Sequence, residues 1–183
     1  MSVAASLAPE ADFFACFGMP RSYALDRDAL EDRYLDLSRE VHPDRFAGGT
    51  ARQQRLAVER SSFVNRAYRT LRDPVQRAEY LIKLGGIDLD RSDPAGGAPD
   101  PGQGFLIEMI ELRESLEEAA KAGSGALGEL RITTEDRQEQ VLDAGIDALE
   151  GDDISVAAGH LVIYRYLQRF LDEVDAAATD LST

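Results

Sequence analysis

The chain has 183 residues, which is enough for one compact domain or two small ones. It carries 20 basic and 34 acidic side chains, so its formal net charge is −14. Because nucleic-acid binding needs a basic surface, this charge argues against nucleic acid as the main ligand. No stretch approaches the roughly 18 consecutive apolar residues of a membrane span, so we expect no membrane partner either.

The single cysteine, Cys16, excludes an intrachain disulfide and a zinc site built from several thiolates. It lies in an apolar run without a nearby histidine, and we interpret it as a buried, unreactive thiol. Residues 1–12 lack the features of a secretory signal and the arginines of a mitochondrial presequence. We therefore expect a protein of the reducing cytoplasm.

Charge is distributed unevenly along the chain. Residues 1–85 hold 13 basic and 12 acidic side chains, whereas residues 86–183 hold 7 basic and 22 acidic ones. The first part is thus close to neutral and the second has a net charge of −15. This asymmetry favours two units with different roles.

Helical patterns dominate the first part of the chain, and alternating strand patterns are nearly absent. A short helix is expected around residues 12–17. Asp26 is a plausible N-cap for a longer helix, which Pro43 should end at Val41 or His42. Its apolar residues recur at spacings of three and four, namely Leu30, Tyr34, Leu37 and Val41.

A second long helix is predicted over residues 52–71, after a short loop that contains Gly48 and Gly49. Two such helices would pack against each other as an antiparallel hairpin. Asp73 and Pro74 should start a further helix, which ends before the glycine pair at 85–86.

Residues 87–104 are rich in glycine, proline and aspartate, so we predict a linker between a domain over 1–86 and one over 105–183. Helices are then expected over 105–122, over about 129–150 after a glycine-rich break at 123–128, and from Asp153 to about 178. The sequence therefore predicts an all-α protein whose second domain is an antiparallel three-helix bundle.

Signals for an enzyme are weak. His42 and His160 fall in different predicted domains, no glycine-rich phosphate loop follows a strand, and the Glu-x-x-His pattern of di-iron bundles is absent. We expect no enzymatic activity, no resident metal and no cofactor.

The tripeptide His42-Pro43-Asp44 lies between the two long helices. On its own it is typical of a helix stop, with proline ending one helix and aspartate capping the next turn. Its position at the tip of a hairpin instead favours a rigid polar loop displayed to solvent.

This helix–loop–helix arrangement resembles the J-domain, the module by which co-chaperones stimulate DnaK-class ATPases. The resemblance includes D-F-F-A-C-F-G-M-P at 12–20, L-E-D-R-Y-L-D-L-S-R-E-V-H-P-D at 30–44 and S-S-F-V-N-R-A-Y-R-T-L-R-D-P-V-Q-R-A-E-Y-L at 61–81. The R-A-E-Y-L ending and F-L-I-E-M-I-E-L-R-E-S-L-E-E at 105–118 are similar to one branch, the bacterial HscB co-chaperones of iron–sulfur cluster assembly.

For the first domain, the resemblance implies binding to a DnaK/HscA-type chaperone through the loop. Basic side chains nearby are candidates for meeting an acidic groove on the ATPase, although they also suit an ordinary solvated helix face. The predicted chaperone-binding residues are His42, Pro43, Asp44, Arg33, Arg39 and Arg45.

For the acidic bundle, the resemblance implies binding to an IscU-like cluster scaffold. The candidate residues are Leu106, Ile107, Ile110, Glu111 and Glu114, with Arg165 and Tyr166 matching more loosely. Residues at 107, 110, 111 and 114 share one helix face, and Phe105, Leu112 and Leu116 can supply the core from the other side. The alternative is that Ile107 and Ile110 are themselves core residues.

The leading hypothesis is a monomeric adaptor that brings a cluster scaffold to its chaperone and accelerates ATP hydrolysis there. One alternative is a regulatory helical protein with an inactive J-like half. Another is a general J-protein that binds unfolded clients. The intact tripeptide disfavours the first alternative, and the lack of a Gly/Phe-rich segment and of zinc-finger cysteines disfavours the second.

Overall fold

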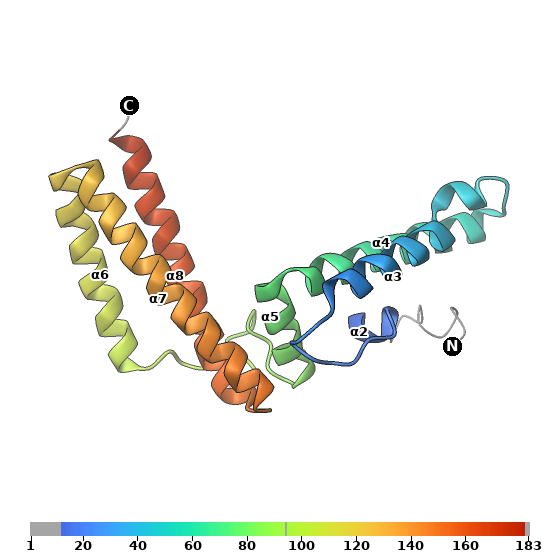
Figure 1. The fold of residues 1–183 in the computed structure, drawn as a ribbon, viewed down its shortest axis with the longest axis horizontal. Coiled ribbons are helices and arrows are strands. Elements are labelled where there is room, and N and C mark those ends of the chain that lie inside the picture. Colours follow the sequence, from blue (N-terminus) through green and yellow to red (C-terminus); the bar gives the residue numbers. More distant parts are fainter. Residues whose placement is uncertain (1–11, 94, 182–183) are drawn as a thin grey trace. The chain divides into compact units, whose positions relative to one another are not determined.

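The computed structural model describes residues 12–93 and 95–181, and within these ranges the chain folds into helices joined by turns, without strands (Figure 1). The chain divides into two compact units, Met1–Leu81 and Ile82–Thr183. The all-α prediction is confirmed. No described helix is long and apolar enough to cross a membrane.

The first unit begins with α2 (Phe13–Cys16) and α3 (Arg27–Val41). The Asp26 carboxylate accepts hydrogen bonds from two backbone N–H groups in the first turn of α3, as its predicted role as N-cap requires. Helix α3 ends at Val41, two residues before Pro43, which confirms the predicted stop.

Helix α4 (Ala51–Arg72) runs antiparallel to α3 and forms the predicted hairpin (Figure 1). It begins with a capping box in which the Gln53 N–H donates to the Thr50 hydroxyl at 3.3 Å, and the Thr50 N–H donates to the Gln53 side chain at 2.8 Å. The core of this hairpin is formed by fully buried side chains, including Phe14, Leu30, Val64 and Leu71.

Helix α5 (Pro74–Leu84) starts where the Asp73 side chain accepts the Gln76 N–H at 2.8 Å. Its Tyr80 ring stacks on Phe13 at 4.4 Å between centroids, and the Tyr80 hydroxyl accepts the Phe13 N–H at 3.0 Å. The short helix α2 is therefore fixed by both an aromatic contact and a hydrogen bond.

Residues 85–93 and 95–98, most of which were predicted as part of a linker, are folded and belong to the second unit. The Asp88 N–H donates to the Gly96 carbonyl at 2.7 Å, an isolated bridge pairs Asp88 with Gly97, and Leu89 is buried. Arg165, far along the chain, donates to the Leu89 carbonyl at 3.0 Å. These described residues therefore form a compact turn and not an extended linker.

The second unit contains α6 (Gln103–Ala122), α7 (Ser124–Glu150) and α8 (Ile154–Asp180), which form an antiparallel bundle (Figure 1). Asp153 caps α8 as predicted, accepting the Val156 N–H at 3.1 Å. The predicted break over 123–128 is wrong. Gly123 alone, at φ +108°, separates α6 from α7.

Helix α7 includes Gly125 and Gly128 in its first turns, where an added Cβ would meet nothing within 4 Å. Each glycine costs a helix about 1 kcal/mol relative to alanine, and burial of Leu127 between them offsets that cost. Gly145 has a different role. A Cβ there would lie 2.7 Å from the Leu161 side chain, so this glycine allows α7 and α8 to approach closely.

Candidate partner-binding sites

The His42-Pro43-Asp44 tripeptide lies where α3 ends and a single turn of 3-10 helix, η1 (Pro43–Phe46), begins. The Asp44 N–H donates to His42 Nδ1 at 3.3 Å, so the imidazole caps this turn. The Asp44 carboxylate points to solvent with 90% of its side-chain surface exposed. The loop thus presents an exposed anionic group on an ordered backbone, with Asp44 Oδ2 3.6 Å from His42 Nδ1.

Several hydrogen bonds hold the loop that carries this group. The Arg45 N–H donates to the His42 carbonyl at 3.0 Å. Gln54, on the first turn of α4, donates to the carbonyls of Ala47 at 2.9 Å and Gly49 at 3.3 Å. Both ends of the loop are therefore tied to helices that are themselves packed.

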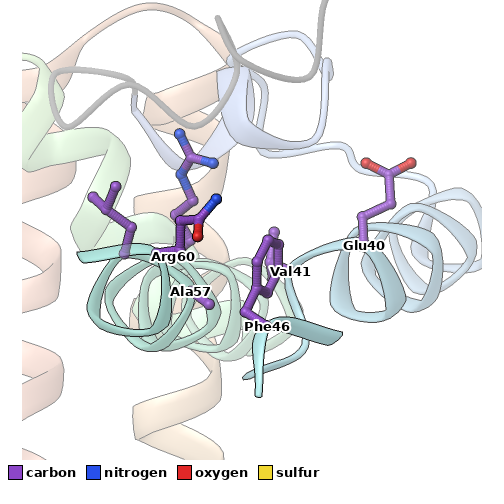
Figure 2. A pocket seen from close by; sticks show the side chains of 7 residues that line it. Glu40, Val41, Phe46, Ala57 and Arg60 are labelled. Carbon is purple, nitrogen blue, oxygen red and sulfur yellow. The ribbon is translucent and has the colours of Figure 1, made fainter. Parts of the chain in front are cut away.

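A hollow of about 310 Å³ adjoins the tripeptide, between the end of α3, η1 and α4. Figure 2 shows Phe46 and Val41 close to Ala57 of α4, with Arg60 at the rim. The Phe46 side chain is half-buried there and fixes η1 on α4. Sequence reasoning did not single out Phe46 or Gln54, because nothing local shows that they hold the loop.

The three arginines predicted to bind a chaperone lie in different surroundings. Arg39 pairs with Asp36 at 3.2 Å on the exposed side of α3, and the Arg45 guanidinium reaches the Arg39 carbonyl at 3.4 Å. Arg33 donates to the carbonyls of Phe17 and Gly18. Its guanidinium thus supplies hydrogen-bond donors to the carbonyls that follow α2, a structural role that the sequence did not reveal. A role of Arg33 in chaperone binding stays a prediction.

Aromatic and polar contacts also hold α3 against α4, in the half of the hairpin away from the tripeptide. Tyr34 and Tyr68 stack with centroids 4.0 Å apart, and the Tyr34 hydroxyl donates to Asn65 at 3.0 Å. The Tyr68 hydroxyl donates to Glu31, and this hydrogen bond to a carboxylate raises the pKa of Tyr68. These contacts bind the two helices through polar groups as well as through the apolar core.

On α6, the structure decides between the two interpretations of the apolar residues in favour of exposure. Leu106, Ile107 and Ile110 keep 42%, 56% and 56% of their surface exposed. Phe105 and Met109, on the opposite face, are buried in the bundle core. We refer to Leu106, Ile107 and Ile110 as the apolar strip.

Carboxylates border the apolar strip. Glu111 and Glu114 are exposed, and neither pairs with a basic side chain among the described residues. By contrast, Glu108 on the same helix pairs with Arg137 of α7 at 3.0 Å. The strip and its two unpaired carboxylates form a surface that suits an apolar patch edged by basic groups.

The two candidate residues on α8 differ in what they contact. Tyr166 packs edge-on against Phe105 with centroids 5.7 Å apart, at the edge of the bundle core. Arg165 instead binds Asp90 at 2.9 Å, together with the Leu89 carbonyl, and so holds the turn that contains these two residues. The structure gives Arg165 a structural role, and its part in scaffold binding stays a prediction.

Side chains arranged for catalysis or metal binding are sparse in the part of the chain that the structure describes. No three or more His, Cys, Asp or Glu side chains there are grouped to hold a metal ion. Cys16 is 2% exposed, and burial raises the pKa of its thiol to about 11. At neutral pH such a thiol is protonated and a poor nucleophile.

Comparison with known families covers both units. A DnaJ domain matches residues 12–80, and the HSCB C-terminal oligomerisation domain matches residues 102–175. The chain belongs to the HscB co-chaperone family. The curated co-chaperone protein HscB homolog of Burkholderia vietnamiensis is 36% identical over an alignment of 178 positions that covers 93% of this chain and 95% of that protein.

Solved structures of HscB proteins are similar in sequence and fold. Chaperone HscB from Vibrio cholerae is 31% identical with a TM-score of 0.73, over 93% of this chain and 99% of that one. Human co-chaperone protein HscB is 30% identical with a TM-score of 0.77, over 92% of this chain and 83% of that one. The resemblance to the HscB branch is thereby confirmed, and with it a co-chaperone with an N-terminal J-domain.

Proposed function

We propose that this HscB-family co-chaperone delivers an IscU-like scaffold protein to a DnaK/HscA-type chaperone and stimulates its ATPase, assisting iron–sulfur cluster assembly and transfer. It acts by binding its partners and catalyses no reaction of its own. We further propose that it works as a cytoplasmic monomer, which light scattering during gel filtration of the purified protein would test.

The observation that carries the proposal is the exposed Asp44 carboxylate on a loop held at both ends. A carboxylate in this setting can accept charge-assisted hydrogen bonds from an arginine of the chaperone. Because the backbone is already ordered, binding costs little additional conformational entropy. The scaffold-binding part of the proposal is supported by the apolar strip and its two unpaired carboxylates, Glu111 and Glu114.

The test is single-turnover ATP hydrolysis by a purified DnaK/HscA-type chaperone, with and without this protein. Asp44→Asn removes the charge and keeps the shape, so stimulation should fall by at least tenfold while helicity and melting temperature stay unchanged. Asp32→Asn, an exposed aspartate on α3, is the matched control and should stimulate like the unaltered protein. Full stimulation by Asp44→Asn would contradict the proposal.

The exposed apolar strip also favours a second candidate function, binding of unfolded clients by a general J-protein. A competition experiment separates the two. A folded cluster scaffold should bind this protein, and an excess of a reduced, unfolded model protein should not displace it. Displacement by the unfolded protein would favour the general adaptor.

A further inference from the structure

The tripeptide contains a hydrogen bond that links its first and last residues. Pro43 has no N–H, so the Asp44 N–H is the first backbone donor of η1 and lacks a partner within the turn. His42 Nδ1 accepts this donor at 3.3 Å. The next donor, the Arg45 N–H, goes to the His42 carbonyl at 3.0 Å. His42 therefore satisfies both of the first two donors of the turn.

We propose that His42 is a positioning residue whose imidazole, in the neutral form with its hydrogen on Nε2, caps η1 and so sets the direction of the Asp44 carboxylate. This inference rests on the proposed function, because it explains how the loop is prepared for the chaperone. The capped N–H and the carboxylate belong to the same residue. The hydrogen bond to His42 that fixes the Asp44 backbone therefore also fixes the position of the Asp44 Cβ.

The distance from Cα to Nδ1 suits the imidazole to capping. Nδ1 is bonded to Cγ, so it stands three bonds from Cα, the same distance along the side chain as Oδ1 of asparagine. Asparagine is a preferred N-cap residue, and its oxygen accepts the N–H two residues ahead in the same way. In glutamine the oxygen lies one bond further out, and alanine has no acceptor.

This comparison gives a test that separates capping from direct contact with the chaperone. In the full chain, His42→Asn should keep stimulation of single-turnover ATPase within about threefold of the unaltered protein. His42→Gln and His42→Ala should each lose about tenfold at the same subsaturating concentration, because the loop is then ordered in a smaller fraction of molecules. Loss with His42→Asn as severe as with His42→Ala would overturn the proposal.

Nuclear magnetic resonance of the protein alone provides the second measurement. The Asp44 amide should exchange slowly in the unaltered protein and in His42→Asn. It should exchange faster in His42→Ala, and equal exchange in all three would overturn the capping role. If the amide behaves as expected but the unaltered protein stimulates no chaperone, the cap stands and the proposed function fails.

Discussion

Replacing the whole apolar strip, Leu106, Ile107 and Ile110, with alanine should weaken scaffold binding by at least tenfold. Full burial of one such side chain is worth about 1.5–3 kcal/mol. Roughly half of each surface is still exposed in the free protein, so a complex gains about 0.7–1.5 kcal/mol from each. The sum for three is about 2–4 kcal/mol, and each 1.4 kcal/mol is a factor of ten in affinity.

The free bundle should be affected much less than the complex. The buried half of each side chain stabilises α6, but alanine has a higher helix propensity than isoleucine and recovers part of the loss. We expect a cost of at most about 0.5 kcal/mol for each residue, or about 1.5 kcal/mol for all three together. Met109→Ala on the core face of the same helix should cost about 2–5 kcal/mol, because it leaves a cavity.

The assay is a calorimetric titration with purified scaffold protein, paired with a thermal melt of each free variant. Ile132→Ala on α7 is the matched control, because this isoleucine is also exposed, at 60%, but lies outside the strip. It should change neither measurement. Unchanged affinity in the triple variant would refute the reasoning, and so would a fall in its melting temperature as large as that of Met109→Ala.

Three further predictions concern charge, pH and the separate units. Reversing Glu111 and Glu114 to lysine should weaken the scaffold complex and flatten the salt dependence of its affinity, which titrations at two salt concentrations measure. The pKa of the Cys16 thiol is about 11 in the folded protein and 9.0 without burial. As pH rises, the unfolded chain therefore loses the thiol proton before the folded protein does, and the stability of the fold decreases above pH 9. Between pH 8 and pH 10 the free energy of unfolding measured in urea should fall by about 1.4 kcal/mol more in the unaltered protein than in Cys16→Ala. An equal fall in both proteins would contradict this prediction. A fragment of residues 1–86 should fold, stimulate the chaperone weakly and bind no scaffold, and measurable scaffold affinity in this fragment would show that the bundle is not the docking surface.

The sequence predicted well those helix ends that depend on neighbouring residues. The carboxylates of Asp26 and Asp153 cap their helices, and Pro43 ends one, because each effect acts within a few residues of its cause. The apolar periodicity of α3 and α4 likewise predicted which helices pack together. Local chemistry was sufficient for these features.

Composition was a poor guide where the outcome depends on distant residues. Two glycine-rich segments look alike in sequence, yet residues 85–93 and 95–98 form a turn and residues 124–128 begin a helix. The turn is held by Arg165, which is 76 residues away from Leu89. Arg33 is similar, since the carbonyls that it binds lie 15 and 16 residues before it. Neither partner can be inferred from the residues beside the arginine.

Both candidate sites combine exposed groups with a fixed backbone, and this combination shapes how substitutions should act. Asp44 is exposed, but Gln54 ties the carbonyls of its loop to α4. The apolar strip is exposed, but Phe105 and Met109 on the opposite face anchor α6 in the core. Groups held in this way lose little freedom on binding, so more of their contact energy appears as affinity.

Substitutions of the residues that hold each site in place should therefore act differently from substitutions of the exposed residues. Changing Asp44 or the apolar strip removes contacts with a partner and leaves the free protein ordered. Changing Gln54 or Met109 disorders the same surface before any partner arrives, and the loss of binding then depends on temperature. Measured at two temperatures, Gln54→Ala should stimulate the chaperone better in the cold, whereas Asp44→Asn should be equally inactive at both. A temperature-independent loss in Gln54→Ala would mean that this glutamine does not act by ordering the loop.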